Sequence, residues 1–187
     1  HNNELKDLEE ILKQIDNLNI KGILFYDLAL VNIHKRLNLK TDLVYAQEHL
    51  STNYGIINYW YKKGVKYAYL SSELTKREID EIRENTLSKL FVNVFGYIPM
   101  YQSYRKVLSM YEEYISRPIK RDNLLLKEDL RNDFYHINEN QYGSVIFRPY
   151  VLSYLENIDY VLEAKYIFLD SNYISKNVFK KVLSLTY

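Results

Sequence analysis

The chain has 187 residues and a formal net charge of +1, from 25 Lys and Arg against 24 Asp and Glu. This balance excludes binding to nucleic acid or to an anionic membrane through net charge alone, so any such binding needs a local patch of positive charge. Cys is absent, which excludes disulfides, thiolate zinc sites, Cys-ligated iron–sulfur clusters and a Cys nucleophile within these residues. No apolar run reaches the ~20 residues that cross a bilayer, so we expect a soluble cytoplasmic domain with no membrane partner.

The first half of the chain alternates predicted helices and strands. Leu and Ile recur at helical spacing from Leu5 to Leu18, which predicts an opening helix. Short apolar runs predict strands at residues 21–26, 42–46, 66–70 and 89–95. Helices are predicted between them because Thr75 and Glu78 have capping-box spacing and Gly64 ends the helix before it.

The second half breaks this alternation. Short strands are predicted at residues 123–127, 134–137 and 144–147, with a turn over 139–143, and we interpret 121–149 as an antiparallel β insertion. Residues 150–164 have apolar side chains at helical spacing, which predicts a helix. A strand at 165–169 and a helix capped by Ser175 follow.

Strands spaced by helices of this length predict parallel β/α units joined by right-handed crossovers. The expected fold class is α/β: a partial TIM-like (β/α) barrel of about five parallel strands with helices, plus the small antiparallel β insertion. We treat residues 1–187 as a single partial-barrel domain, the C-terminal portion of a longer protein, because the opening helix lacks a strand before it. Exposed barrel edges predict pairing with a second copy, which makes a homo-oligomer the expected state.

Polar residues gather where the predicted parallel strands end, the face that carries chemistry in β/α barrels. Glu48 and Glu73 are candidate catalytic carboxylates, with His49 as the candidate imidazole and Ser72 as a further candidate. The candidate substrate-binding residues are Asp27, Gln47, Asn93, Tyr97 and Asp170. Carboxylates around one mouth also suit a divalent cation, but no metal-ligand spacing identifies one, so the cofactor and the metal stay unknown. The alternative is that these carboxylates cap helices or pair with Lys and Arg, which we favour for Asp27 and Asp170.

One stretch combines positive charge with nearby aromatic residues. Residues 117–121 (RPIKR) supply three cations near Tyr111 and Tyr114. Such a patch suits nucleic acid, but a solvated basic loop is the interpretation that we favour for it. No Gly-rich phosphate loop and no GxSxG nucleophile elbow occur in the sequence.

Several blocks of the sequence carry a family resemblance. The most distinctive are QEHL at 47–50, SSEL at 71–74 and FGYIPM at 95–100, followed by NLLLKEDLRNDFYHI and YIFLDS. Together they resemble the collagenase-like proteases, the peptidase family of unknown catalytic type numbered thirty-two, from Leu5 to about Phe179. The resemblance implies a TIM-like barrel and protease activity, and Glu48, His49, Ser72 and Glu73 fall in matching blocks.

The resemblance fails at one signature. After the fourth strand the family places a Gly, two Cys, a second Gly and a Ser; Gly96 and Ser109 match, but Pro99 and Lys106 stand at the Cys positions and Tyr104 at the second Gly. Relatives that hydroxylate RNA bases depend on Cys-ligated iron–sulfur clusters. The resemblance therefore does not carry that chemistry onto this chain.

Two functions follow as hypotheses, and whether the chain is an enzyme stays open. The first is hydrolysis of a peptide or protein substrate, with Glu48 or Glu73 as general base on water and His49 assisting. The alternative is a non-catalytic or accessory module in tRNA or rRNA base hydroxylation. Such a module binds RNA or a partner protein through residues 117–121 and the Tyr-rich loops.

Overall fold

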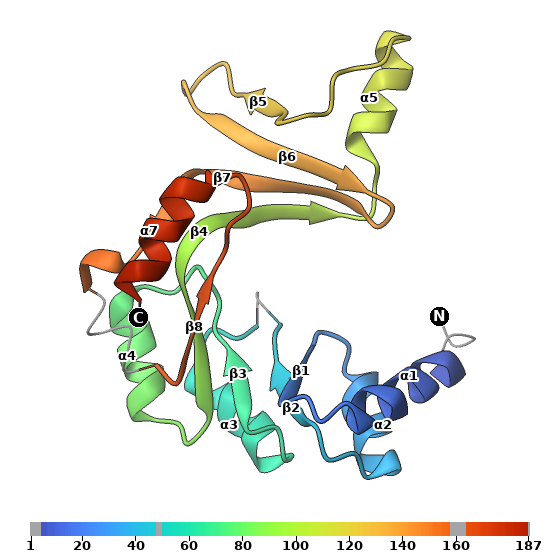
Figure 1. Ribbon diagram of the computed structural model, residues 1–187, viewed down its shortest axis with the longest axis vertical. Coiled ribbons are helices and arrows are strands. Elements are labelled where there is room, and N and C mark those ends of the chain that lie inside the picture. The colour runs from blue at the N-terminus through green and yellow to red at the C-terminus, as the bar shows by residue number, and fades with distance from the viewer. Residues whose placement is uncertain (1–4, 48–49, 158–163, 187) are drawn as a thin grey trace. The chain divides into compact units, whose positions relative to one another are not determined.

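The computed structural model describes residues 5–47, 50–157 and 164–186. The chain divides into two compact units, which are described separately. Unit 1 comprises residues 1–93 and 160–167, and unit 2 comprises residues 94–159 and 168–187. Two strands contribute to both units: β4 (Lys89–Ser103) and β8 (Tyr166–Leu169) (Figure 1).

Unit 1 is a series of β/α repeats. Its further elements are α1 (Leu5–Asn17), β1 (Gly22–Phe25), α2 (Ala29–Leu37), β2 (Asp42–Tyr45), α3 (Tyr54–Lys62), β3 (Tyr67–Tyr69) and α4 (Lys76–Glu84). Strands β1 to β4 pair in chain order and in parallel. A helix between each pair of strands makes this order possible, because parallel neighbours need a long crossover. The strands predicted at 21–26, 42–46 and 66–70 are confirmed.

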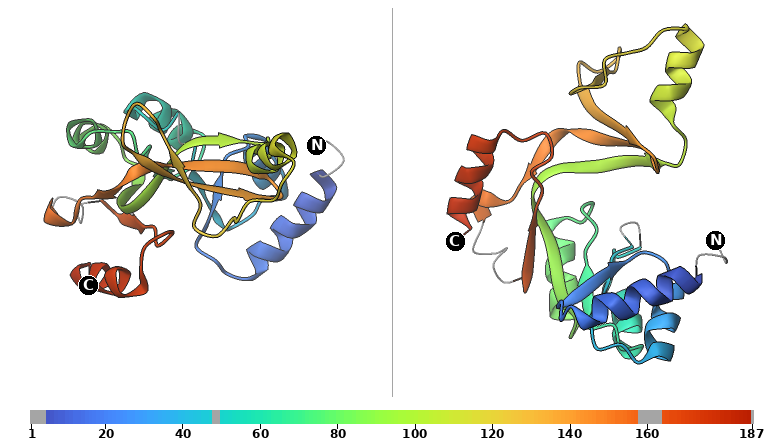
Figure 2. Two further views of the ribbon diagram at one scale, coloured as in Figure 1. Left: turned by 90° about the horizontal axis from the view of Figure 1, so that it is seen from above. Right: turned by 45° about the vertical axis from the view of Figure 1, so that its right-hand side comes forward.

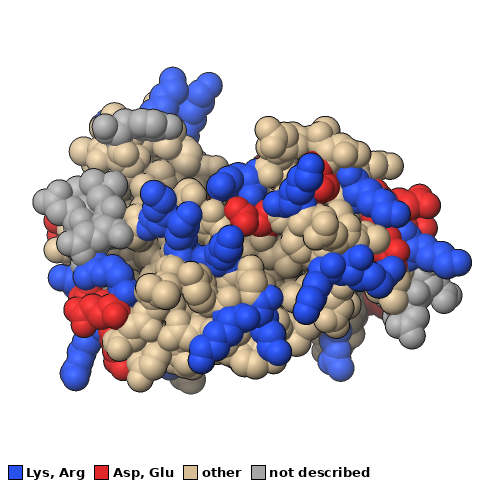
Figure 3. Space-filling model, turned by 90° about the horizontal axis from the view of Figure 1, so that it is seen from below, with Lys and Arg blue, Asp and Glu red and all other residues tan. Residues whose placement is uncertain are grey.

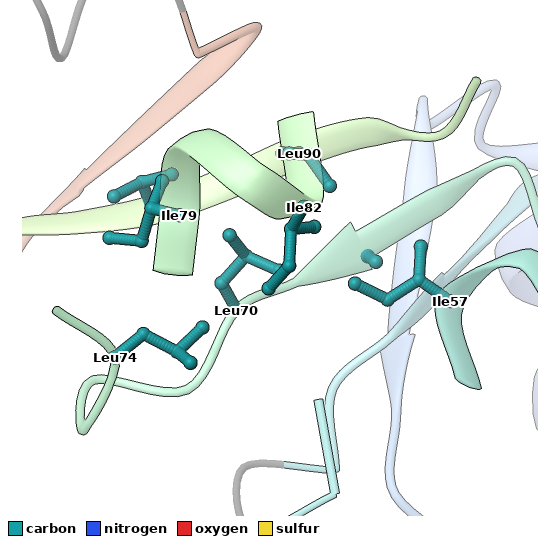
Figure 4. Close-up of a cluster of buried hydrophobic side chains, with 8 residues drawn as sticks. Ile57, Leu70, Leu74, Ile79, Ile82 and Leu90 are labelled. Carbon is teal, nitrogen blue, oxygen red and sulfur yellow. The ribbon is translucent and has the colours of Figure 1, made fainter. Parts of the chain in front are cut away.

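The core of unit 1 lies between its sheet and helices α3 and α4. Figure 4 shows this cluster, whose buried members are Ile57, Ala68, Leu70, Leu74, Ile79, Ile82, Leu90 and Val92. Alternation along β3 and β4 sends Ala68, Leu90 and Val92 to this face. The predicted capping box is present at the start of α4, where the Thr75 hydroxyl accepts from Glu78 N and the Glu78 carboxylate accepts from Thr75 N. The box aligns α4 so that Ile79 and Ile82 are buried.

A second core cluster of unit 1 is aromatic. Phe25, Tyr45 and the single Trp of the chain, Trp60, have ring centroids 5.4 to 6.2 Å apart. Tyr59 meets the Trp60 ring edge-on at 5.2 Å. Tilted and edge-on contacts of this kind add to the free energy gained by burying the rings. The cluster holds α3 against β1 and β2.

Unit 2 is mainly antiparallel. Its further elements are α5 (Val107–Ile115), β5 (Leu125–Lys127), β6 (Phe134–Asn140), β7 (Gly143–Ser153), the short helix η2 (Leu155–Asn157) and α7 (Lys176–Leu185). The strand order is β4-β7-β6-β5. β6 and β7 form a long hairpin beside the second half of β4, as Figures 1 and 2 show. This confirms an antiparallel segment near the predicted insertion.

The helix predicted over 150–164 is wrong for residues 150–153, and Leu155–Asn157 forms only the short 3-10 helix η2. Residues up to Ser153 belong to β7, where Val151, Leu152 and Ser153 pair with β4. These apolar residues have helical spacing, but they form a strand because the edge of the extended β4 needs hydrogen-bond partners. β4 itself continues to Ser103, beyond the predicted end at residue 95.

The fold class is mixed α/β. The sheet is parallel from β1 to β4 and antiparallel from β4 to β5, so the described strands do not form a mostly parallel sheet. Closure into a TIM-like barrel and the single-domain organisation stay predictions. None of the helices in the described residues is both long and apolar enough to cross a bilayer.

Candidate functional site

The polar residues that follow β1 and β2 form hydrogen bonds with neighbouring backbone groups. Asp27 follows β1, and its carboxylate accepts a hydrogen bond from Ala29 N at 2.8 Å. Gln47 follows β2 and donates from its side-chain amide to the Tyr26 carbonyl. Asp27 therefore stabilises the turn that leads into α2, whose N-cap residue is Leu28, and Gln47 ties two neighbouring strand ends together.

The end of β3 is a tight turn. Ser71 N donates to the Ser51 carbonyl at 3.2 Å, and the Ser71 hydroxyl accepts from Glu73 N at 3.3 Å. Ser72 is buried at 9 % exposure, whereas Glu73 is exposed. A carboxylate on the surface of such a turn is open to solvent, so Glu73 is accessible to a substrate or to a partner.

Asn93 of β4 has a partner that the sequence analysis missed. Tyr69 at the end of β3 donates from its hydroxyl to the Asn93 side-chain oxygen at 2.5 Å, and Asn93 is only 7 % exposed. The signal was available: Tyr67 and Tyr69 alternate along β3, and Phe91 and Asn93 alternate along β4 in matching register. These four side chains share the sheet face opposite the core cluster.

That face carries a hollow of about 290 Å³ nearer the strand starts, lined by Lys21, Gly22, Leu24, Asp42, Val44, Tyr67, Phe91 and Tyr166. Phe91 and Tyr166 stack with ring centroids 4.4 Å apart. At its rim Lys21 pairs with Asp42 at 3.6 Å. Interaction with Tyr67, and then with the Asp42 carboxylate, raises the pKa of Lys21. The hollow is thus mostly aromatic with one ion pair at its edge.

Two further candidates lie in unit 2. Tyr97 meets His136 edge-on at 4.8 Å, and His136 stacks on Tyr173 at 4.0 Å. Burial lowers the pKa of His136, which favours the neutral imidazole in this stack. Asp170 caps its own turn by accepting from Asn172 N at 2.6 Å. His136 and Tyr173 were not predicted as site residues, because they lie far apart in the chain.

Glu48 and His49 lie outside the described residues, and the catalytic roles assigned to them, to Ser72 and to Glu73 stay predictions. The structure places Gln47 and Ser72 just after the ends of β2 and β3, whereas Asn93 lies within β4, where Tyr69 of β3 contacts it. In the described parts of the chain, no three His, Asp or Glu side chains come together as a metal site requires.

Two signature positions of the resemblance, Gly96 and Ser109, hold local structure in unit 2. A Cβ on Gly96, whose φ is +134°, would lie 2.5 Å from the Asp170 Cβ. Ser109 donates from its hydroxyl to Glu139 at 2.5 Å. Pro99 pairs with Phe147 in the β4–β7 ladder, and Lys106 precedes α5. Without a thiolate at any of these positions, the residues present do not fit a Cys-ligated iron–sulfur cluster.

The sequence profile described as peptidase family U32 matches residues 1–172. The chain belongs to this family. The U32 resemblance of the strand-end blocks is thereby confirmed. No solved structure matches the chain.

Three curated relatives match this U32 chain. tRNA hydroxylation protein P2 of Bacillus subtilis is 28% identical over 170 residues, which cover 88% of this chain and 55% of that protein. tRNA hydroxylation protein P1 of the same organism is 24% identical over 109 residues, covering 58% of this chain and 26% of that protein. An uncharacterized protease of Methanocaldococcus jannaschii is 32% identical over 85 residues, covering 46% of this chain and 20% of that protein. The chain spans about half the length of P2.

Proposed function

We propose that this U32 chain is an accessory, RNA-binding module in tRNA hydroxylation. The observation that carries the proposal is the match to tRNA hydroxylation protein P2 over 88% of this chain. The second relative of the same description, P1, supports it. The proposal assigns the chain to the cytoplasm, where tRNA is modified, and to a barrel-like β/α scaffold in unit 1.

The chain's own residues favour binding over redox chemistry. A cluster held by thiolates has no ligand here, because the sequence has no Cys. What unit 1 does offer is an aromatic hollow with Lys21 at its rim and an exposed Glu73. Aromatic faces stack on unpaired bases, and lysines attract phosphates. The module therefore presents tRNA to a separate hydroxylating centre.

Binding of tRNA to the whole chain tests this proposal. Fluorescence anisotropy with a labelled tRNA transcript should show binding in 50 mM salt that weakens steeply towards 200 mM, because phosphate contacts release counterions (~0.7 to 0.9 in log–log slope for each contact). Mass spectrometry of tRNA nucleosides from cells lacking the gene should show less hydroxylated uridine or cytidine. If the chain fails to bind tRNA even in 50 mM salt, the proposal is wrong.

Peptide hydrolysis is a second candidate, supported by membership of a family described as peptidases. In this function Glu48 or Glu73 is the general base on water, His49 assists and Ser72 is a further candidate catalytic residue. A quenched fluorescent casein substrate compares the unaltered chain with Glu48→Gln and Glu73→Gln. Glu84→Gln, on the exposed end of α4, is the control. Equal hydrolysis by all four proteins would remove the carboxylate mechanism.

A further inference from the structure

Lysine residues stand at the starts of the strands in unit 1. Lys21 directly precedes β1, Lys66 precedes β3, Lys89 opens β4 and Lys165 precedes β8, while Lys40 lies two residues before β2. All five are exposed. We call this set the lysine row. Parallel strands begin at the same edge of a sheet, about 4.8 Å from one neighbour to the next. Backbone bonds fix this alignment, since Lys89 N donates to the Lys66 carbonyl at 2.9 Å and Asp42 N to the Lys21 carbonyl at 3.3 Å.

The row opens onto a pocket between two loops. The pocket has a volume of about 320 Å³ and lies between the loop from α2 to β2 and the loop from α3 to β3. Its cationic lining residues are Lys35, Lys40, Lys63 and Lys66, and Asp42 is its acidic one. We call these four lysines with their cavity the lysine pocket. The volume is about ten times the ~30 Å³ that one water molecule occupies in the liquid, so a phosphate group fits.

Hydrogen bonds hold the walls of the pocket in place. The Asp16 carboxylate of α1 accepts from Lys40 N at 2.8 Å and from Thr41 N at 2.7 Å. The same Thr41 accepts at its carbonyl from the His34 Nε2–H at 2.6 Å. On the other side Gly64, at a φ of +97°, ends α3 with its N–H on the Tyr61 carbonyl. The side chains of Lys40, Lys63 and Lys66 thus project from loops whose backbone is held by hydrogen bonds, and that of Lys35 projects from the last turn of α2.

The charges of the pocket are available to a ligand. Lys35, Lys40 and Lys66 form no ion pair with a carboxylate among the described residues. Asp16 is engaged by the backbone, and Asp42 by Lys21. On the face that Figure 3 shows, Lys and Arg side chains are more widespread than Asp and Glu side chains. Because the chain as a whole carries only +1, this face is a local excess of positive charge.

Helix stabilisation explains part of this pattern. Lys35 lies in the last turn of α2 and Lys62 in that of α3, where a cation offsets the partial negative charge of the helix end. That effect does not account for Lys40 or Lys66, which lie in loops beyond the helices. Each helix end carries a partial negative charge of about half a unit, so the two ends offset only part of the positive charge of these lysines. The remaining positive charge makes the surface suited to an anion.

From these observations we infer that the lysine row and lysine pocket form the surface on which unit 1 binds the phosphate backbone of RNA. This inference rests on the proposed function, and it moves the contact away from residues 117–121 of unit 2. A phosphate enters the pocket between Lys40 and Lys66, and the row continues along the strand starts to neighbouring phosphates. Such contacts position the RNA without reading its sequence.

The test compares two triple variants of the whole chain by tRNA anisotropy. Lys35→Gln/Lys40→Gln/Lys66→Gln removes three charges from the lysine pocket. Lys176→Gln/Lys180→Gln/Lys181→Gln removes three exposed charges from α7 and is the matched control. At 0.15 M salt we expect the pocket variant to bind about 100-fold more weakly, ~5-fold for each lost contact, with a salt slope shallower by about 2 to 3. The control should stay within about two-fold of the unaltered chain, with thermal unfolding of both variants measured alongside.

The results distinguish tRNA binding by the chain from the choice of the lysine surface as the place where tRNA binds. Binding by the pocket variant that equals that of the unaltered chain, or an equal loss in the α7 control, overturns the surface while tRNA binding stands. Failure of the unaltered chain to bind tRNA overturns the proposed function and this inference together. Equally tight binding of polyglutamate of matched charge overturns RNA as the ligand, because a lysine surface for phosphates should discriminate against carboxylates on a flexible chain.

Discussion

At the scale of single residues, Glu139 shows how one carboxylate organises unit 2. Its carboxylate accepts from Leu108 N at 2.7 Å and from the hydroxyls of Ser109 and Ser144 at 2.5 and 3.1 Å, and it pairs with Arg121 at 3.0 Å. Burial raises the pKa of Glu139, but the hydrogen bonds outweigh burial and lower it to about 2. The carboxylate therefore caps the start of α5 and joins it to the β6–β7 hairpin.

We predict that Glu139→Gln destabilises the protein by about 2 kcal/mol at pH 7, the typical value of a hydrogen bond to a charged group. The folded pKa is below the unfolded value near 4.5, so this stabilisation is present above pH 4.5 and is lost as the pH falls towards 2. Urea unfolding at pH 7 and at pH 2.5 measures the difference between the variant and the unaltered chain, which should narrow at the lower pH. A difference that stays constant, or an equal loss in the exposed α5 control Glu113→Gln, would contradict this prediction.

The positions of candidate-site residues could be predicted from the sequence where these residues directly follow a strand. Asp27, Gln47 and Ser72 lie where apolar runs stop, and the structure places them there. Tyr69 and His136 were not found, because their contacts join segments far apart in sequence. A single sequence shows which face a residue takes in a strand but not which residue it meets.

At the scale of elements, the two positive-φ glycines outside the signature differ in what surrounds them. At Gly143, where φ is +131°, a Cβ would lie 2.0 Å from the Ser103 carbonyl oxygen. At Gly64, where φ is +97°, no atom lies within 4 Å of such a Cβ. The first glycine lets the β6–β7 hairpin approach the end of β4, and the second only ends a helix.

Substitution by Ala should separate these two roles. We predict that Gly64→Ala costs about 1 to 2 kcal/mol, the strain of a left-handed conformation. Gly143→Ala should cost more than ~3 kcal/mol, because backbone must move as well. Urea unfolding followed by far-ultraviolet circular dichroism gives both values, and equal losses would show that the close approach at Gly143 is unimportant.

Elements were predictable from sequence where local pattern and tertiary pairing agree. The strands of unit 1 are short apolar runs between caps, and their positions are confirmed. The failure at residues 150–153 arose because apolar residues at helical spacing were needed as strand partners of β4. The length of β4 was missed for the same reason, since pairing with β7 carries it beyond its apolar part.

At the scale of the whole molecule, the nearly balanced net charge gives no sign of the lysine row and the lysine pocket. A net charge of +1 predicted no bulk attraction to RNA, yet lysines recur at the strand starts of unit 1. The basic patch was predicted at 117–121, but there Arg121 pairs with Glu112 and Glu139. The parallel order of the strands brings these lysines to one edge of the sheet, and the net charge of the chain does not indicate this arrangement. Self-association through strand edges stays a prediction.

The aromatic cluster around Trp60 supplies an optical probe of this surface. The chain has one Trp, so indole emission comes from a single residue of unit 1, and Tyr45 and Tyr59 lie 5.4 and 5.2 Å from it, close enough to transfer excitation to it. The Trp60 carbonyl accepts from Lys63 N and Val65 N, so the indole belongs to the residue that anchors one pocket loop. We expect tRNA to alter Trp60 emission in the unaltered chain but not in the Lys35→Gln/Lys40→Gln/Lys66→Gln variant. A titration in a fluorimeter thus reports occupancy without a label, and an unchanged spectrum at saturating tRNA would place the RNA away from α3.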